Sequence, residues 1–287
     1  MIDQEDYLRF LNHLQSIISL KESCRPLSED KKYSHDDVRN TYYRQVMNVI
    51  NDYYLGMIGP FFMNRIKDPL GNGTIAQYLP CAIENELFSN LGFLCSFSYL
   101  KTWHDMKKVG LVFSLWIVFE DSIDIIYQNI ATESEIEKYK NGTFNRIKKI
   151  IEGKLIDEDI QSIQEKLKSD YIGINNKYNY ILNFLTLDKN QKKKVKEIRD
   201  FLQFFNILRN SLHTNSRPMK NYEFKLSIGT FKFEKNKHID FFTLDVLYNS
   251  INEFVKIFSF LRENLDIEKE MFNTASLVEN SYTGTDL

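Results

Sequence analysis

Apolar residues recur every three or four positions along most of this chain, a spacing typical of helices with one buried face. The pattern predicts helices over residues 3–20, 36–58, 133–152, 156–168 and 174–185. From Pro80 the chain is densely apolar, and we expect two long core helices there, separated by a break near "HDMKK" at residues 104–108. A further helix begins after Asp188, which with Gln191 three residues later comes close to a capping box, and a last helix follows Thr243.

The period changes from helical to alternating at residue 222. In "YEFKLSI" apolar and polar residues alternate, which predicts a strand; "GT" predicts a turn, and "FKFEK" begins a return strand. Only 11 Gly and 5 Pro occur in 287 residues, so the chain offers few positions for turns. The sequence therefore predicts an all-α helical bundle with one small β-hairpin inserted before the last helix.

The clearest loop, "KDPLGNGTIAQYLP" at residues 67–80, suggests how the chain is divided. We expect an N-terminal helical extension over residues 1–65 and a helical domain over residues 80–265. A polar tail over residues 266–287 follows, and we expect it to be loosely held from about Glu268.

Charge and cysteine content narrow the class of protein. The net charge of -2 excludes an overall basic field, so any contact with nucleic acid must be local. Three widely separated cysteines and an acidic N-terminus without the apolar segment of a signal peptide indicate a reduced, cytoplasmic protein. The longest apolar run, "VGLVFSLWIVF", is too short to span a bilayer, so we expect no membrane association.

An arginine interrupts the apolar face of the helix that follows Asp188. At about 100° per residue, Arg209 falls within the stripe that Leu202 and Phe205 define, and His213 lies one turn later. Asn206 and Asn210 lie beside this pair. The end of the helix therefore presents a guanidinium, an imidazole and two amides together.

A buried guanidinium without a partner is costly, so Arg209 needs an acid, a phosphate ligand or a wet cleft. Glu120 and Asp124, one turn apart on a core helix, are the acids that we expect to approach it. Two interpretations stay open at this point. One is a structural Arg–Glu pair with a satisfied histidine at the helix end, and the other is a polar functional site.

The segment "LRNSLHTN", followed by a strand, a hairpin and a long amphipathic helix, resembles the HEPN superfamily of prokaryotic defence and toxin systems. The resemblance covers roughly residues 80–265 and implies a helical bundle of HEPN type. It also implies a metal-independent RNA endonuclease without a cofactor, which cleaves by 2′-OH attack at a composite homodimer site. A cognate antitoxin or defence partner would accompany such an enzyme.

The resemblance implies catalytic roles for Arg209, Asn210 and His213. A neutral imidazole can take or give a proton, and a guanidinium can hold a phosphate and stabilise its developing charge. We expect supporting roles for Asn206, Glu120 and Asp124. Carboxylates and histidines occur nowhere at convincing metal-ligand spacing, so the sequence predicts no metal site.

Lysines cluster at the start of the same helix, where we expect Lys192, Lys193 and Lys196 to bind flanking RNA. The alternative for this run is a solvated helix face. Two alternatives to the nuclease also stay open. One is a catalytically inactive HEPN-like protein that binds RNA, a nucleotide or a protein partner, which the short three-residue spacing between Arg209 and His213 favours. The other is a helical interaction protein in which both residues are structural.

Overall fold

The computed structural model describes residues 4–66, 97–151, 157–168, 171–213, 217–237, 239 and 243–272. Within these ranges the chain forms nine helices and one two-stranded hairpin, which confirms the predicted all-α class with a small hairpin. The helices are α1 (Gln4–Ser28), α2 (Val38–Ile66), α4 (Phe97–Ile130), α5 (Glu133–Lys140), α6 (Gly142–Ile151), α7 (Asp157–Leu167), α8 (Ile174–Phe184), α9 (Lys189–His213) and α10 (Leu244–Asn264). The strands are β1 (Tyr222–Leu226) and β2 (Gly229–Phe233).

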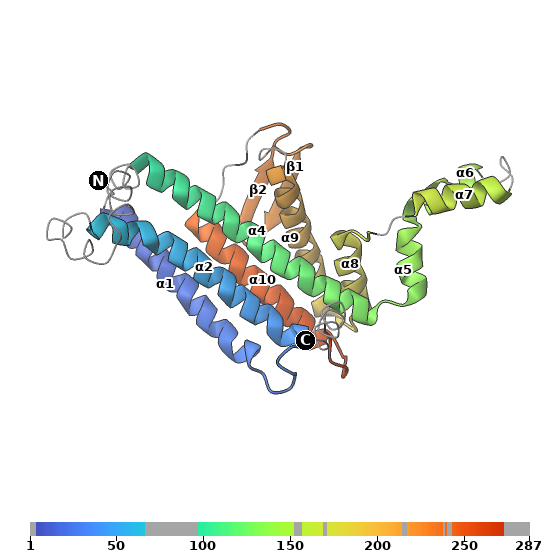
Figure 1. The fold of residues 1–287 in the computed structure, drawn as a ribbon, viewed down its shortest axis with the longest axis horizontal. Coiled ribbons are helices and arrows are strands. Elements are labelled where there is room, and N and C mark those ends of the chain that lie inside the picture. Colours follow the sequence, from blue (N-terminus) through green and yellow to red (C-terminus); the bar gives the residue numbers. More distant parts are fainter. Residues whose placement is uncertain are drawn as a thin grey trace, which may run out of the picture.

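Four long helices form the body of the molecule, with α1, α2, α4 and α10 running side by side (Figure 1). Helix α9 and the hairpin cover one side of this body, and α8 lies near the C-terminal end of α4 (Figure 1). Helices α5, α6 and α7 project away from the body as an arm (Figure 1). The site predicted at the end of α9 therefore belongs to the body and not to the arm.

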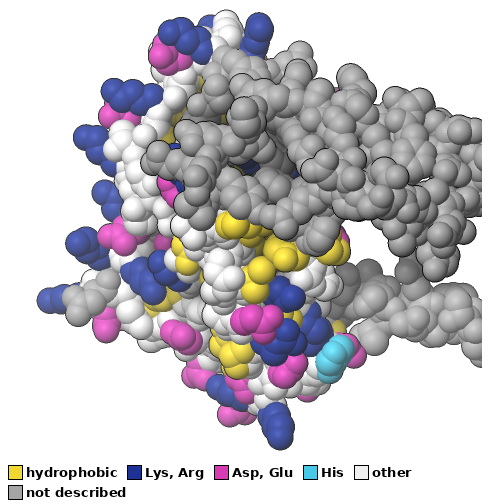
Figure 2. Space-filling view, turned by 90° about the vertical axis from the view of Figure 1, so that its left-hand side faces the viewer, with side chains coloured by type: hydrophobic (Ala, Val, Ile, Leu, Met, Phe, Trp, Pro, Cys, Tyr) yellow, Lys and Arg dark blue, Asp and Glu magenta, His cyan; other side chains and the backbone are white. Residues whose placement is uncertain are grey.

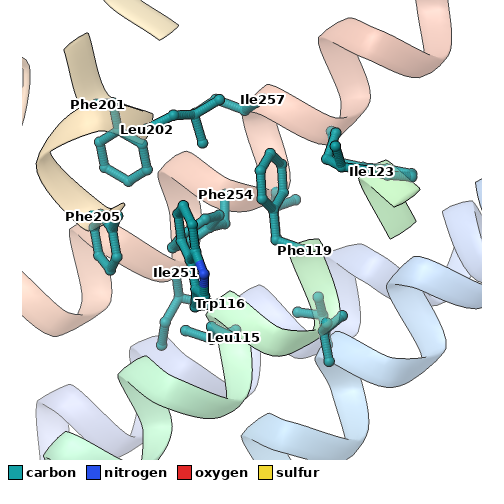
Figure 3. Close-up of a cluster of buried hydrophobic side chains, with 14 of the residues drawn as sticks. Leu115, Trp116, Phe119, Ile123, Phe201, Leu202, Phe205, Ile251, Phe254 and Ile257 are labelled. Atoms are coloured by element: carbon teal, nitrogen blue, oxygen red, sulfur yellow. The ribbon is translucent and has the colours of Figure 1, made fainter. Parts of the chain in front are cut away.

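The aromatic centre of the core joins α4, α9 and α10 (Figure 3). Phe254 of α10 is fully buried, and its ring lies 5.4 Å from that of Phe119 and 4.7 Å from that of Phe205. Trp116 and Phe201 complete the ring of neighbours at 6.3 and 5.3 Å. Aromatic contacts at these separations add to the energy of burial, so α9 is held firmly where it crosses the body.

The hairpin packs its aromatic face onto α9. Phe224, Phe231 and Phe233 surround Phe204 with ring separations of 5.6, 4.7 and 5.5 Å. The predicted turn at "GT" is wrong by two residues, because the turn lies at residues 227–228 and Gly229 already belongs to β2. The φ angle of Gly229 is +138°, a conformation that a residue with a side chain rarely adopts.

The predicted break at residues 104–108 is wrong, because α4 continues through it. Polar residues alone do not stop a helix when neither proline nor a C-terminal glycine cap is present. Here Lys107 also lies against α2, since a Cβ atom at Gly56 would be 2.7 Å from Lys107 Cε. The lysine stem covers the close crossing of α2 and α4 instead of ending the helix.

The single helix predicted over residues 133–152 is in fact two helices that meet at Asn141. The Asn141 side chain donates to the backbone carbonyl of Glu137 at 2.9 Å and to its carboxylate at 3.0 Å. Gln164 of α7 donates to Asn141 Oδ1 at 3.3 Å. A short polar side chain that bonds locally in this way ends α5, and its bond with Gln164 joins the bend between α5 and α6 to α7.

A buried ion pair holds the segment after α10 against the start of α2. Arg39 donates to the carboxylate of Asp37 at 2.7 Å and to the carbonyls of Ile267 and Lys269 at 2.8 and 3.0 Å. The backbone N–H of Met271 donates to Asp37 at 2.9 Å. The expectation that the chain is loosely held from Glu268 is therefore wrong as far as residue 272, and residues 273–287 lie outside the described ranges.

The first two helices share their core with the rest of the body. The ring of Tyr42 in α2 stacks on Phe258 of α10 with a centroid separation of 3.7 Å, and the Tyr42 hydroxyl donates to the Phe254 carbonyl at 3.2 Å. Residues of the predicted extension thus pack into the core of the predicted domain. The boundary expected between residues 65 and 80 falls almost wholly outside the described residues.

Candidate functional site

Helix α9 begins at a reciprocal cap and ends at the predicted site. The backbone N–H of Gln191 donates to Asp188 Oδ1 at 2.8 Å, and the N–H of Asp188 donates to Gln191 Oε1 at 2.9 Å. This is the capping box that sequences of this kind predict. His213 is the last helical residue, one turn beyond Arg209, and its side chain lies outside the described atoms.

The helical angles predict Arg209 within the apolar stripe of α9, and in the structure its side chain is partly buried. Its neighbours Phe205 and Leu208 are buried, whereas Asn210 is exposed. Arg209 Nη1 donates to Asn210 Oδ1 at 3.2 Å, and Asn210 Nδ2 donates to Asn206 Oδ1 at 3.4 Å. The structure therefore brings Arg209, Asn210 and Asn206 together as one hydrogen-bonded row.

Glu120 lies on α4, which packs against α9, but it does not pair with the arginine. Trp116 Nε1 donates to one carboxylate oxygen of Glu120 at 3.1 Å, and the Tyr171 hydroxyl donates to the other at 3.4 Å. Within the described ranges, no carboxylate lies within 4.0 Å of the Arg209 guanidinium. The expected Arg–Glu ion pair is thus not formed, although both residues lie near Tyr171.

Asp124 also has another partner, because Lys177 of α8 forms an ion pair with it. The Lys177 side chain is only 12% exposed, and its ammonium lies 5.6 Å from the centre of the Tyr171 ring. The ion pair joins α8 to α4 at the edge of the site. Asp124 is therefore placed to hold α8 in position and not to contact Arg209.

Sequence reasoning missed Tyr171 and Lys177. A signal for Lys177 was present, since it lies three residues after Ile174 and four before Ile181, both of which are buried. A lysine at that spacing lies at the border of an apolar face, where its ammonium needs a partner. Tyr171 precedes α8 in a segment without periodicity, and no local pattern marks it.

The charges around Tyr171 alter its acidity. The side chain is 66% exposed, but its hydroxyl end is partly withdrawn from water against α4, which raises its pKa. The charge of Glu120 and the hydrogen bond to it act in the same direction, while Arg209 opposes them. The tyrosine is therefore a neutral donor at physiological pH, and it lies within the electrostatic reach of both Glu120 and Arg209.

Comparisons with known proteins do not place this chain in a family. No family model matches the chain, and no curated protein and no solved structure is significantly similar to it. Any functional conclusion therefore rests on the arrangement of the side chains.

The predicted RNA-binding lysines lie far from the end of α9. Lys192, Lys193 and Lys196 are all exposed on its first turns. At 1.5 Å per residue, Lys196 is about 26 Å from His213 along the helix axis. The face in Figure 2 shows basic and acidic side chains interspersed, so that face is not one continuous basic surface.

Two further kinds of site are absent from the described residues. No group of three or more His, Cys, Asp or Glu side chains in these ranges is arranged to hold a metal ion. No helix in the same ranges is long and apolar enough to cross a membrane.

Proposed function

We propose that this protein is a metal-independent RNA endonuclease of HEPN type, with the end of α9 as its active site. The observation that carries the proposal is the state of Arg209. It is a partly buried guanidinium whose described partner is a neutral amide and not a carboxylate. Such a group retains its full charge and most of its planar donors for a phosphate.

The neighbouring side chains support this role. Both oxygens of Glu120 are engaged by Trp116 and Tyr171, which keeps the carboxylate from neutralising Arg209. Asn210 accepts a hydrogen bond from Arg209 and is itself bonded to Asn206, so the amides orient the guanidinium. A preoriented donor loses less entropy when a phosphate binds, which favours stabilisation of a transition state.

The residues match the needs of 2′-OH attack. A neutral His213 takes the proton from the ribose 2′-OH as its oxygen attacks the phosphorus. Arg209 stabilises the negative charge that builds on the phosphate oxygens, and the 5′-oxygen leaves with a proton from an acid. The products are a 2′,3′-cyclic phosphate and a 5′-OH end, and no metal takes part.

One chain supplies one imidazole at this site, so we propose that a second copy supplies the other across a two-fold axis. A His213→Cys variant tests this point. Its chains should form an intermolecular disulfide under mild oxidation, since a disulfide requires Cα atoms within about 7 Å. The wild-type protein under the same oxidant controls for Cys24, Cys81 and Cys95.

The central experiment incubates the protein with mixed RNA in EDTA and maps the new ends. Cleavage should leave the two expected ends, and Arg209→Ala and His213→Ala should each lower the rate by about 100-fold or more. Arg199→Ala is the matched control, because Arg199 lies on the same helix and bonds Asn183 away from the site. Unchanged cleavage in the His213 variant would contradict the proposal.

The same experiment distinguishes the nuclease from a catalytically inactive HEPN-like protein. RNA binding that depends on Arg209 without any cleavage would identify a silent HEPN-like binding protein. If the enzyme belongs to a defence or toxin system, expression of the wild type should arrest bacterial growth and His213→Ala should relieve the arrest. Co-expression with a cognate antitoxin would then restore growth.

A further inference from the structure

Strand β1 has one edge that no strand of the described residues pairs with. It pairs with β2 on one side, and within the described residues no other strand pairs with it. A groove of about 730 Å³ follows this strand where it lies beside α9. The lining consists of Lys196, Asp200 and Gln203 from α9 and residues 222–225 of β1.

The open edge of a strand is a template for another strand. Charged residues on an edge usually prevent such pairing. In β1, however, Glu223 and Lys225 are both exposed, carry opposite charges and lie two residues apart on the same face. Their effect therefore depends on the direction and register of the incoming strand.

We infer that the occupant of this groove is β1 of a second copy of the chain, paired antiparallel about a two-fold axis at Phe224. In this register Glu223 of each copy faces Lys225 of the other, so the attraction occurs twice. Tyr222 faces Leu226 in the same way, and both are only partly buried in the single chain. The sequence of β1 is thus complementary to itself, as a two-fold interface requires.

The charges also select against other arrangements. A parallel pairing in register places Glu223 beside Glu223 and Lys225 beside Lys225, which repel. An antiparallel pairing centred on residue 223 or 225 brings two like charges face to face in the same way. Only the register centred on Phe224 makes both charge contacts attractive.

The existing hairpin already contributes to such a row of charges. Lys232 of β2 lies opposite Glu223, with its ammonium 3.6 Å from the carboxylate. In the four-stranded sheet, Glu223 would lie between Lys232 of its own chain and Lys225 of the second copy. An alternating row of this kind stabilises neighbouring strands more than an isolated surface pair does.

This interface is separate from the composite nuclease site. Phe224 contacts Phe204 with a ring separation of 5.6 Å, and Phe204 lies nine residues before His213. Nine helical residues span about 14 Å, so the two proposed interfaces use different parts of α9 and its neighbours. The inference does not depend on the proposed function, and the failure of either leaves the other standing.

Exchange of the two charges tests the inference. We expect the wild-type chain to associate through β1 in a concentration-dependent way in sedimentation or light scattering, in addition to any association through the composite site. Lys225→Glu and Glu223→Lys should each remove this association step and reduce the size of the assembly, because each variant places like charges face to face across β1. The triple variant E223K/K225E/K232E restores opposite charges both between the copies and within the hairpin, where residue 232 faces residue 223, and should restore the association.

The control is Lys235→Glu, which makes the same change of charge at an exposed residue beyond the end of β2 and should leave the dimer intact. Circular dichroism of each variant checks that the fold is retained. A wild type that does not associate, an assembly whose size is unchanged by the single charge reversals, or a triple variant that does not regain the wild-type assembly would each overturn the inference. A dimer that the His213→Cys variant joins by a disulfide, but that is insensitive to these reversals, would overturn it as well and would support the composite site.

Discussion

Two arginines of this protein have opposite surroundings. Arg39, at the start of α2, is 1% exposed and donates to both oxygens of the Asp37 carboxylate. It also donates to two backbone carbonyls, and its guanidinium lies 3.9 Å from the centre of the Tyr33 ring. Arg209, at the end of α9, is partly buried, and its described hydrogen-bond partner is the amide of Asn210.

The difference shows how a structural arginine is bound in this protein. Burial alone would raise the pKa of Asp37, yet the hydrogen bonds from Arg39 and from the Met271 N–H lower it overall. Both charges of that pair are therefore kept and fully bonded. A carboxylate was also available near Arg209, but Glu120 is bonded elsewhere. This contrast favours a ligand as the partner of Arg209.

The largest expected effect comes from breaking the buried pair. Arg39→Ala should lower the free energy of unfolding by about 3–5 kcal/mol, because it leaves the Asp37 carboxylate buried without a cation. Denaturant titration measures the change. Arg25→Ala is the control, since Arg25 forms an exposed pair with Glu22 and should change the stability by no more than about 1 kcal/mol. A loss below about 1 kcal/mol for Arg39→Ala would remove the basis of the comparison.

Acid should lower the free energy of unfolding through protonation of His13. This residue is buried in α1 beside the Tyr53 hydroxyl at 3.0 Å, and burial lowers its pKa to about 4. Because the folded pKa is below the unfolded value of about 6.5, the folded state binds fewer protons in this range. Its contribution is complete above pH 6.5 and is lost progressively as the pH falls to about 4, by about 3 kcal/mol in total.

The measurement compares the wild type with His13→Gln across this range of pH. Glutamine keeps a polar group near Tyr53 but does not titrate. The free energy of unfolding of the His13→Gln variant should therefore fall less steeply between pH 6.5 and 4 than that of the wild type. Arg209→Ala should keep the steep dependence of the wild type. Parallel curves for the wild type and His13→Gln would contradict the assignment.

The smallest expected effect on stability is that of Arg209→Ala. We expect a change within about 1 kcal/mol, because no described carboxylate is left buried without its cation. Thermal or denaturant unfolding measures the change, alongside the loss of RNA cleavage. A destabilisation comparable to that of Arg39→Ala would instead identify Arg209 as a structural residue.

Local rules predicted much of the region around α9. The capping box at Asp188, the buried stripe and the alternation in β1 each act within a few residues, so the sequence alone was sufficient. Helical periodicity also predicted that Arg209 lies among apolar residues of this helix, although its side chain is only partly buried. These features depend on helical and strand periodicity and not on distant packing.

Features that depend on distant partners were not predictable. The continuity of α4 through residues 104–108 involves Lys107 packing on Gly56 of α2. The order of residues 268–272 depends on Asp37 and Arg39, which lie 234 and 230 positions before their partners Met271 and Lys269. The pairing of Glu120 with Arg209 was predicted wrongly because one of its actual partners, Tyr171, comes from a segment without periodicity.

The contacts between α2 and the last part of the described chain have a consequence for folding. Tyr42 reaches Phe254 across 212 positions, and Asp37 reaches Met271 across 234. Contacts of such long sequence separation form slowly, because a large loop must close, at a cost in chain entropy, before the contact can stabilise the fold. During synthesis, the apolar face of α1 and α2 that contacts α10 therefore stays uncovered until α10 has been made. An uncovered apolar face of this kind can associate with other chains, so aggregation is favoured during that interval.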